Sequence, residues 1–479
     1  MHRRTFLRAG AAALGLSALD ASSAWAGWLG AGARAVPSPR QLAWQRAGLG
    51  LFVHFGVNTF TDREWGDGTE DPRIFNPTRL DARQWARAAR AGGFRTMILT
   101  AKHHDGFCLW PSRYTGHSVK NSPWKNGQGD VVREFTEAAH AEGLGVGLYL
   151  SPWDRHEPSY GTPAYNDHYV AQLTELLTGY GPLTEIWFDG ANGEGPNGKH
   201  QEYDWPRFHR TIRALQPGAL IFSDAGPDIR WIGNEKGIAG DPDWCAVDPT
   251  VVPRPGMSGP EVTRSLQHGN PHGTVWRPGE ADVSIRPGWF WHADQDDEVR
   301  SADDLLGLYF SSVGRNANLL LNVPPTTEGL FHPTDVERLA EFGERRRRLF
   351  SADLASAARA SASASDGRAR GPQRVVDGDP DSYWSPPGGA TTGWVELDLG
   401  RPVTFDVVSL REAIAHGQSV EGYTVQGWTG SRWATLSRGT TIGNHKLDRV
   451  PPTTASRVRL SVESSLGTPR ITGLALHEG

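Results

Sequence analysis

Residues 130–150 read DVVREFTEAAHAEGLGVGLYL, and this stretch decides the fold of the larger part of the chain. Asp130 is suited to cap a helix and Gly143 to end it, so the first part predicts a helix. The residues from Gly145 to Leu150 form a short apolar run, as in strands buried within parallel sheets. A helix followed at once by such a strand predicts a repeating βα unit.

The same alternation extends over residues 36–350. A stretch without periodicity, rich in Gly, Pro and Trp, interrupts it at 226–288. This length of repeat favours one α/β domain, a TIM-like (β/α)₈ barrel, over two smaller domains. The remaining predicted strands are 50–55, 95–100, 184–189, 220–223 and 318–323, and the remaining predicted helices are 81–92, 166–180, 205–215, 302–312 and 334–348.

The sequence changes in character after residue 350. Residues 351–371 are a low-complexity Ala, Ser, Gly and Arg segment, which is typical of a linker. Residues 372–479 contain short alternating strands, separated by turns and without a helix signal, which predict a C-terminal β-sandwich. The predicted strands there are 394–399, 423–428, 457–462 and 471–476.

The composition excludes several classes of protein. The formal net charge of the 479 residues is −5, so no overall basic field exists to bind nucleic acid or an anionic membrane. Two cysteines, Cys108 and Cys245, are too few for a disulfide scaffold, and two buried thiols or one bridge remain as alternatives. The 19 tryptophans are unusual, and stacking on the apolar faces of sugar rings is one reason to have them.

The N-terminus predicts export. Arg3 and Arg4 precede an apolar run from Ala9 to Leu19 and an Ala-Trp-Ala pattern that ends at Ala26. The apolar run is too short to cross a bilayer, so residues 1–26 are interpreted as a cleaved bacterial signal peptide of twin-arginine type. An ordinary secretion signal with two chance arginines is the alternative. We expect a periplasmic or secreted protein.

Polar and aromatic residues follow the predicted strands at 54–58, 102–106, 151–154 and 189–190. In a (β/α)₈ barrel these positions share the C-terminal face, where active sites are built. The pattern therefore predicts a pocket at that face.

Three acidic residues in or near these segments could carry out chemistry. Asp189 ends an apolar strand, Glu235 lies in a loop, and Glu64 follows the first strand. Two carboxyl groups flanking a glycosidic bond are the minimum for its hydrolysis, about 5–5.5 Å apart when one is a nucleophile. An ordinary strand-end aspartate that caps a loop is the alternative for Asp189.

Three histidines also follow strands, namely His54, His103 and His104. They could ligate a metal, but adjacent residues of an extended segment point to opposite sides, so we favour hydrogen bonds to sugar hydroxyls and predict no metal. Four tryptophans are predicted to line the pocket as stacking or wall residues, and structural packing is the alternative for each of them. These are Trp65, Trp153, Trp231 and Trp289.

Five segments stand in order along the chain, at 48–56, 64–65, 101–107, 186–190 and 318–325. Together, and at this spacing, they resemble the α-L-fucosidases of glycoside hydrolase family 29. The resemblance implies that Asp189 attacks C1 of fucose with retention of configuration. It also implies that the fucose hydroxyls are held by His54, Glu64, Trp65, His103 and His104.

The loop at 226–235 resembles that of the subfamily which cleaves α-1,3/1,4-linked fucose, and the resemblance implies that Glu235 is the general acid/base. Arg230, Trp231 and Glu280 are similar to neighbours of the substrate in that subfamily. We therefore expect a retaining exo-α-L-fucosidase that acts by double displacement on fucosylated oligosaccharides or glycoconjugates, without a cofactor. The alternatives are an inactive fucose-binding, lectin-like protein and a metal-dependent hydrolase that uses His103 and His104.

The C-terminal domain resembles the discoidin-like (F5/8 type C) fold, used as a carbohydrate-binding module, through residues 377–384 and 393–400. Related modules hold a structural Ca²⁺ near such an Asp-rich turn, although Asp-Gly-Asp is also an ordinary turn. Only the resemblance therefore predicts a calcium ion in this domain.

Overall fold

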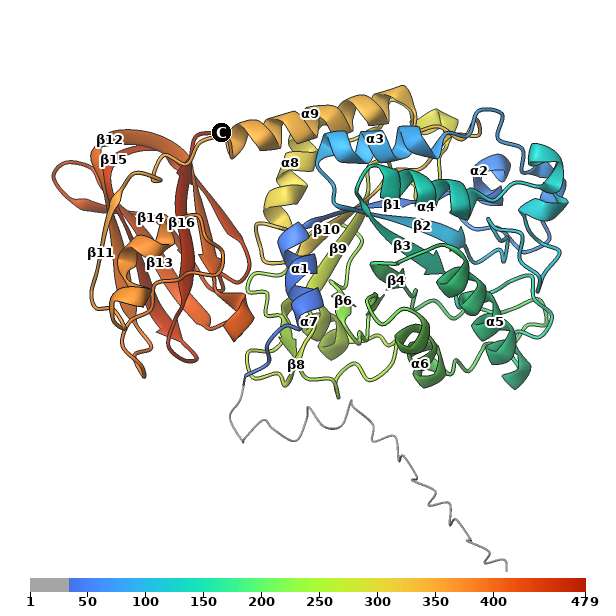
Figure 1. Ribbon diagram of the computed structural model, residues 1–479, viewed down its shortest axis with the longest axis horizontal. Coiled ribbons are helices and arrows are strands. Elements are labelled where there is room, and N and C mark those ends of the chain that lie inside the picture. The colour runs from blue at the N-terminus through green and yellow to red at the C-terminus, as the bar shows by residue number, and fades with distance from the viewer. Residues whose placement is uncertain (1–33) are drawn as a thin grey trace, which may run out of the picture. The chain divides into compact units, whose positions relative to one another are not determined.

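Eight parallel strands close into a barrel in the computed structural model, which describes residues 34–479 (Figure 1). The order around the barrel is β1-β10-β9-β6-β5-β4-β3-β2, so the predicted TIM-like α/β barrel is confirmed. The strands are β1 (Leu49–Val53), β2 (Thr96–Lys102), β3 (Gly145–Leu150), β4 (Glu185–Trp187), β5 (Leu220–Ser223), β6 (Ile229–Trp231), β9 (Gly279–Ser284) and β10 (Asn318–Asn322).

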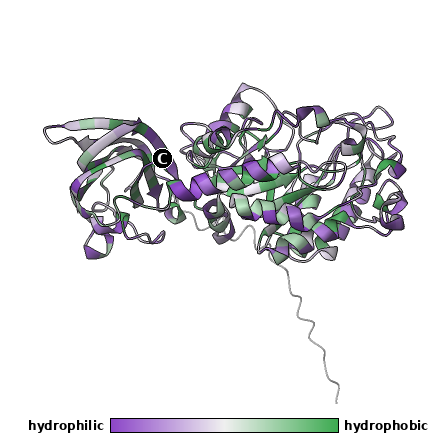
Figure 2. Ribbon diagram, turned by 90° about the horizontal axis from the view of Figure 1, so that it is seen from above, coloured by the Kyte–Doolittle hydropathy of each residue, from purple (hydrophilic) through white to green (hydrophobic). Residues whose placement is uncertain are grey.

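Helices cover the outside of the barrel, and Figure 2 shows hydrophobic residues concentrated in the strands and hydrophilic residues along the helices. In α3, Asp81 accepts hydrogen bonds from the first-turn amides, and Gly93 ends the helix with φ of 84°. The buried face of this helix carries Trp85, which packs into the main core. The helices are α1 (Pro39–Ala47), α2 (Val57–Thr61), α3 (Ala82–Gly92), α4 (Val131–Ala141), α5 (Pro163–Gly179), α6 (Trp205–Leu215), α7 (Pro260–His268), α8 (Ala302–Ser311) and α9 (Pro333–Leu349).

The irregular stretch 226–288 contains two barrel strands, β6 and β9, that periodicity does not reveal. β6 has three residues, too few to show a period. β9 places polar side chains at alternate positions, where they face the barrel interior, so it lacks an apolar run. Only residues 224–228 connect β5 to β6, and they form no helix. The same stretch holds α7 and a small antiparallel pair, β7 (Ala246–Val247) and β8 (Val275–Trp276).

The C-terminal residues 351–479, called the β-domain below, form an antiparallel, sandwich-like sheet, which confirms the predicted β class. Trp384, Phe405 and Tyr423 are buried in its core. β16 pairs with β12 beside the main strand order β11-β12-β15-β13-β14. The strands are β11 (Arg359–Ala362), β12 (Gly393–Glu412), β13 (Val420–Trp428), β14 (Trp433–Gly439), β15 (Lys446–Ser465) and β16 (Ile471–His477).

The segment 351–371 packs within the β-domain and does not form the free linker that its composition predicts. It contains β11, which pairs antiparallel with β12. Ala355 and Ala358 are buried, and the Leu354 amide donates to the Leu476 carbonyl at 2.9 Å. Small side chains allow the backbone of this segment to pack closely against the sheet. The Ala- and Ser-rich composition therefore reflects close packing and not flexibility.

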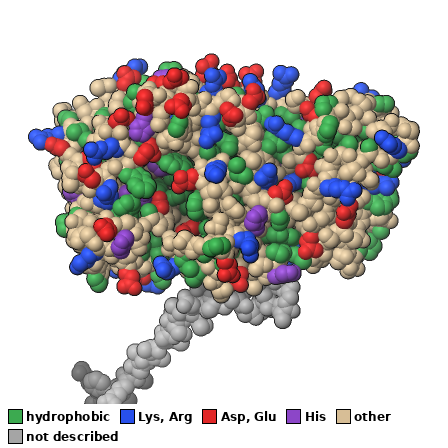
Figure 3. All heavy atoms as spheres, turned by 180° about the vertical axis from the view of Figure 1, so that it is seen from behind, with side chains coloured by type: hydrophobic (Ala, Val, Ile, Leu, Met, Phe, Trp, Pro, Cys, Tyr) green, Lys and Arg blue, Asp and Glu red, His purple; other side chains and the backbone are tan. Residues whose placement is uncertain are grey.

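Cys108 and Cys245 are both free and buried, which removes the single-bridge alternative. None of the helices within residues 34–479 has both the length and the apolar character needed to cross a membrane. Acidic and basic side chains are interspersed on the face drawn in Figure 3, without a large patch of one sign. The predicted signal peptide, residues 1–26, lies outside the described residues.

Candidate active site

A cavity of about 450 Å³ opens at the carboxyl ends of the barrel strands, at the face predicted for the site. Its volume falls within the range of small-molecule pockets, and it combines aromatic walls with carboxyl and imidazole groups. The lining residues are Phe52, His54, Glu64, Trp65, His103, His104, Tyr149, Trp187, Asp189, Ala191, Glu235, Asp282 and Trp289.

The cavity brings together most of the residues singled out from the sequence. Both acids expected to act on the glycosidic bond, Asp189 and Glu235, line it. So do all three histidines, Glu64, Trp65 and Trp289. Trp153, Trp231, Arg230 and Glu280 do not.

Asp189 is held firmly two residues beyond the end of β4. Its Oδ2 accepts a hydrogen bond from the Tyr149 hydroxyl at 3.1 Å, and its Oδ1 accepts one from the Ala191 amide at 2.8 Å. Burial, together with the charge of Asp189, raises the pKa of Tyr149, so the phenol stays protonated and remains a donor. Both oxygens are thus oriented, and Oδ2 lies 3.9 Å from His104 Nε2.

Glu235 lies on the loop after β6, exposed at the cavity mouth, and its Oε2 accepts from Trp289 Nε1 at 3.4 Å. Partial desolvation by the surrounding protein raises the pKa of Glu235 even at this exposed position, and the charges of Asp189 and Glu64 add to the increase. The cavity therefore holds one acidic group fixed in orientation and a second whose pKa is raised, which suits a nucleophile and a general acid.

Two of the histidines have defined tautomers. Asn322 donates through its Nδ2 to the Trp289 carbonyl at 2.8 Å, so its Oδ1 accepts from His54 Nδ1 at 2.8 Å. The Ser151 hydroxyl donates to the Trp153 carbonyl and so accepts from His104 Nδ1, both at 2.7 Å. Burial lowers the pKa of His54 to about 3 and also lowers that of His104. Each neutral ring keeps Nε2 as an acceptor for a substrate hydroxyl.

His103 and His104 line the same cavity, contrary to the opposite orientation expected from the sequence. β2 ends at Lys102 and a turn begins at His104, so the alternation of an extended strand does not apply. Their ring centroids are 4.1 Å apart. Buried Lys102 holds this corner through Asp154 Oδ2 at 2.8 Å and Gln172 Oε1 at 3.0 Å.

Glu64 is bound to the segment after β9. It accepts hydrogen bonds from the amides of Trp289 at 2.9 Å and Phe290 at 3.1 Å, and lies 2.7 Å from His292 Nε2. Burial lowers the His292 pKa, but the hydrogen bonds to Asp62 and Glu64 outweigh it and the pKa is raised. Trp65, by contrast, is 61% exposed, so an indole surface is available at the mouth for a sugar ring.

Four residues predicted to contact substrate have other positions. Arg230 is buried, pairs with Asp243 and bonds to backbone carbonyls. Glu280 lies deeper in the barrel, where it accepts from Trp187 Nε1 at 3.0 Å. The Trp231 indole N–H donates a hydrogen bond to the Asp282 carboxyl group. Trp153 is partly exposed and packs against His104, with the ring centroids 4.8 Å apart.

Asp282 is the main cavity residue that the sequence reasoning missed. It is 4% exposed and accepts from Trp231 Nε1 at 2.8 Å. Burial, with the Glu235 charge adding, raises the pKa of Asp282 to about 8. The signal in the sequence is the alternation Glu280, Asp282, Ser284, which places polar groups on one face of a strand. Phe52, Tyr149 and Trp187 were also missed, because their strands read as ordinary apolar runs.

Within residues 34–479, no group of three or more His, Cys, Asp or Glu side chains is arranged to hold a metal ion. In the cavity, the Nδ1 atoms of His54 and His104 are used by Asn322 and Ser151. The arrangement supports hydrogen bonding to hydroxyl groups.

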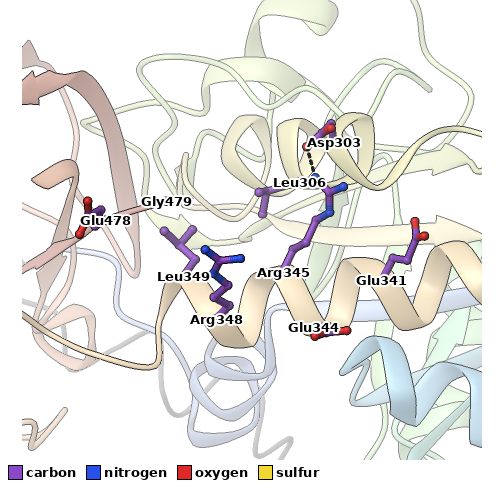
Figure 4. A pocket seen from close by; sticks show the side chains of 9 residues that line it. All are labelled: Asp303, Leu306, Glu341, Glu344, Arg345, Arg348, Leu349, Glu478 and Gly479. Carbon is purple, nitrogen blue, oxygen red and sulfur yellow. Dashed lines mark hydrogen bonds and ion pairs between the residues drawn. The ribbon is translucent and has the colours of Figure 1, made fainter.

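A second cavity, of about 540 Å³, is lined by residues of α8 and α9 and by the last two residues of the chain (Figure 4). An ion pair between Asp303 and Arg345 joins its walls, and Arg348 and three glutamates also line it. It contains no aromatic side chain and no histidine, so it offers neither a stacking surface nor the acceptor array of the first cavity.

Two family models match the chain. The α-L-fucosidase model matches residues 69–345, and the F5/8 type C domain model matches residues 357–475. In sequence, the chain is 46% identical over 449 residues to α-L-fucosidase 1 of Arabidopsis thaliana, covering 92% of this chain and 87% of that protein.

Solved structures give the same result. The crystal structure of SpGH29 superposes with a TM-score of 0.88 at 43% identity, covering 93% of this chain and 98% of that chain. A Ruminococcus gnavus GH29 fucosidase in complex with fucose has a TM-score of 0.86 at 35% identity, covering 93% and 96%. Both likenesses extend over the barrel and the β-domain.

The raised pKa of Asp282 makes stability depend on pH. The folded protein retains this proton up to about pH 8, whereas an aspartate in the unfolded chain loses it near 3.8. The wild type should therefore lose stability relative to Asp282→Asn as pH rises from 3.8 to about 8, because Asn still accepts from Trp231 but cannot ionise. Thermal unfolding of both proteins across this range measures the difference. Exposed Asp303→Asn is the control, and parallel curves for wild type and Asp282→Asn would contradict the prediction.

Proposed function

This chain belongs to the α-L-fucosidase family, glycoside hydrolase family 29, and from that premise we propose that it is a retaining exo-enzyme for α-1,3- and α-1,4-linked fucose. Its activity is that of an α-L-fucosidase, a hydrolase that releases fucose, and its C-terminal part is an F5/8 type C domain. The observation that carries the proposed mechanism is the cavity that holds Asp189 and Glu235 together.

In the first step, an oxygen of Asp189 forms a bond to C1 of fucose while the bond from C1 to the leaving oxygen breaks. Glu235 gives its proton to that oxygen, so the aglycone leaves as an alcohol. The Tyr149 hydroxyl and the Ala191 amide hold the attacking carboxylate in one orientation. The raised pKa of Glu235 favours the protonated form that this step requires.

In the second step, water attacks C1 of the glycosyl-enzyme intermediate and the bond to Asp189 breaks. Glu235, now ionised, takes the proton from this water and is ready for another cycle. Two inversions at C1 give net retention. No group outside the cavity is needed to balance the protons.

The fucose hydroxyls bind the polar wall in this proposal. His54 and His104 present neutral Nε2 atoms that accept hydrogen bonds, and Glu64 offers carboxylate oxygens. Trp65, exposed at the mouth, packs against an apolar face of a sugar ring. The Ruminococcus gnavus relative, whose structure is a complex with fucose, supports this choice of ligand.

The linkage preference rests on the loop that carries Glu235. Its sequence at 226–235 resembles the subfamily that cleaves α-1,3/1,4-linked fucose from branched structures. Both expected carboxyl groups are present in the cavity, which supports hydrolysis over binding without turnover. The residues named for a metal-dependent hydrolase, His103 and His104, lie in no metal-ligand group of the described chain. Export by a twin-arginine signal to the periplasm or beyond belongs to the same proposal, supported by residues 1–26.

Replacing the nucleophile should abolish turnover without unfolding the protein. Asp189→Ala should lower kcat for an aryl α-L-fucoside by at least about 10³-fold, since no other group can form the bond to C1. Circular dichroism and thermal unfolding check the fold. A variant with near-normal kcat would reject Asp189, and loss of wild-type activity in EDTA would favour the metal-dependent alternative.

Replacing the acid/base should separate its two tasks. Glu235→Ala should lose about 10²–10⁴-fold in kcat/KM with a poor leaving group, but much less with an activated aryl fucoside that leaves unprotonated. Azide should restore turnover of the activated substrate and yield α-fucosyl azide, because azide needs no general base. Identification of this product by NMR is the measurement, and absence of both rescue and product would remove Glu235 from the role.

A panel of fucosylated oligosaccharides tests the linkage. We expect fucose release from α-1,3- and α-1,4-linked substrates to exceed release from α-1,2- and α-1,6-linked substrates by at least about tenfold in kcat/KM, equivalent to one well-placed polar contact in the aglycone site. Fucose is quantified by chromatography. Equal rates on all linkages would overturn the linkage proposal and leave the family assignment intact.

A further inference from the structure

The loop that carries Glu235 spans residues 232–243, and an ion pair joins its two ends. Arg230, the middle residue of β6, contacts the Asp243 carboxylate at the far end of the loop. Both side chains are buried at about 1% exposure. Arg230 also donates to the carbonyls of Leu266 and Arg277, so it cannot move independently of its surroundings. The position of Asp243 therefore fixes where the loop ends.

Asp243 is in turn held by the β-domain. Its backbone amide donates to the Thr441 hydroxyl at 3.1 Å, and its carbonyl accepts from Gln418 Nε2 at 2.8 Å. Gln418 also accepts from the Cys245 amide at 3.1 Å. Thr441 and Gln418 are each 4% exposed, so water does not compete for these bonds.

A second pair of contacts lies two residues earlier. Asp241 accepts from Lys446 Nζ at 2.7 Å and from the Thr440 hydroxyl at 2.9 Å, and both donors belong to the β-domain. The end of the loop is thus bound through the backbone of Asp243 and through the side chain of Asp241.

The near half of the loop is bound to the barrel instead. The Ile232 amide donates to the Glu280 carbonyl at 3.0 Å, and the Gly237 amide donates to the Asp282 carbonyl at 3.1 Å. Glu235 lies between these two bonds to β9. β9 therefore holds the loop on both sides of Glu235, and the anchored end at Asp243 holds the part of the loop that follows.

We infer that the β-domain is part of the catalytic apparatus, with Thr441 and Gln418 acting as positioning residues that hold the Glu235 loop over the cavity. This inference rests on the proposed role of Glu235 as general acid/base. Neither residue touches the cavity, so their effect on the reaction passes through Asp243, Arg230 and the loop. Loss of these contacts would displace the loop and with it Glu235. The step disturbed would be proton donation, because a general acid must lie within hydrogen-bond reach of the leaving oxygen.

The test compares two substrates in one full-length protein: an aryl fucoside with an activated leaving group and a fucosylated oligosaccharide with an unactivated one. Thr441→Val and Gln418→Met keep the side-chain size but remove the hydrogen bonds to the loop. Each should lower kcat/KM for the oligosaccharide about tenfold to a hundredfold more than for the aryl fucoside. Because both substrates meet the same sample, the ratio of the two values is independent of the folded fraction.

Thr441→Ser, which keeps the hydroxyl, should restore the wild-type ratio. Asn444→Ala is the matched control, since Asn444 of the β-domain bonds to the Gln45 carbonyl of α1 at 2.9 Å and does not touch the loop. It should leave the ratio unchanged. Glu235→Gln, measured in parallel, sets the largest change of ratio that loss of the acid can cause.

Three results would overturn the inference. If Glu235→Gln changes the ratio and Thr441→Val and Gln418→Met do not, the β-domain has no positioning role and the acid assignment stands. If Asn444→Ala changes the ratio as much as they do, the effect is general to the contact between the domains. If Glu235→Gln itself leaves the ratio at the wild-type value, the proposed acid fails and the inference fails with it.

Discussion

Hydrogen bonds from tryptophan N–H groups to carboxyl groups are the interactions on which the barrel interior depends. Burying a carboxyl group without a partner is costly, and an indole supplies one donor on a large apolar body that can pack in a core. The barrel and its cavity use this pairing repeatedly, which accounts for part of the high tryptophan content. The pairs are Trp44 with Glu185, Trp187 with Glu280, Trp231 with Asp282 and Trp289 with Glu235, at 2.8–3.4 Å.

The burial of these carboxyl groups also affects the charge beneath the cavity. Burial, reinforced by neighbouring carboxylates, raises the pKa of Asp282 to about 8 and that of Glu280 well above its usual value. These shifts favour the neutral form of both groups, which limits the negative charge beneath the cavity. Glu235 belongs to the same series and its pKa is also raised, but it lies at the mouth, where solvent can reach it.

The sequence predicted the barrel because helix caps and apolar strands such as 145–150 are local signals, and it located Asp189 because a strand end fixes where a side chain lies. It failed where tertiary contacts decide. β9 was hidden because its alternate residues are polar toward the barrel interior, and Arg230 was assigned to substrate although Asp243 binds it. His103 and His104 were separated by assuming an extended backbone that ends at Lys102. The role of Glu235 came from family resemblance, since nothing local distinguishes it from other loop acids.

The two carboxyl groups are supported in different ways, and the chemistry explains the difference. In the proposed mechanism the nucleophile must meet C1 along a defined path, and Asp189 is oriented by β4, Tyr149 and the Ala191 amide, all within the barrel. The acid must reach an oxygen whose position varies with the aglycone, which favours a loop over a strand. The Glu235 loop takes part of its support from β9, through the Ile232 and Gly237 amides, and part from outside the barrel. The contacts from Thr441 and Gln418 to Asp243 provide support of this kind, so a domain that takes no part in lining the cavity can still affect how the proton is delivered.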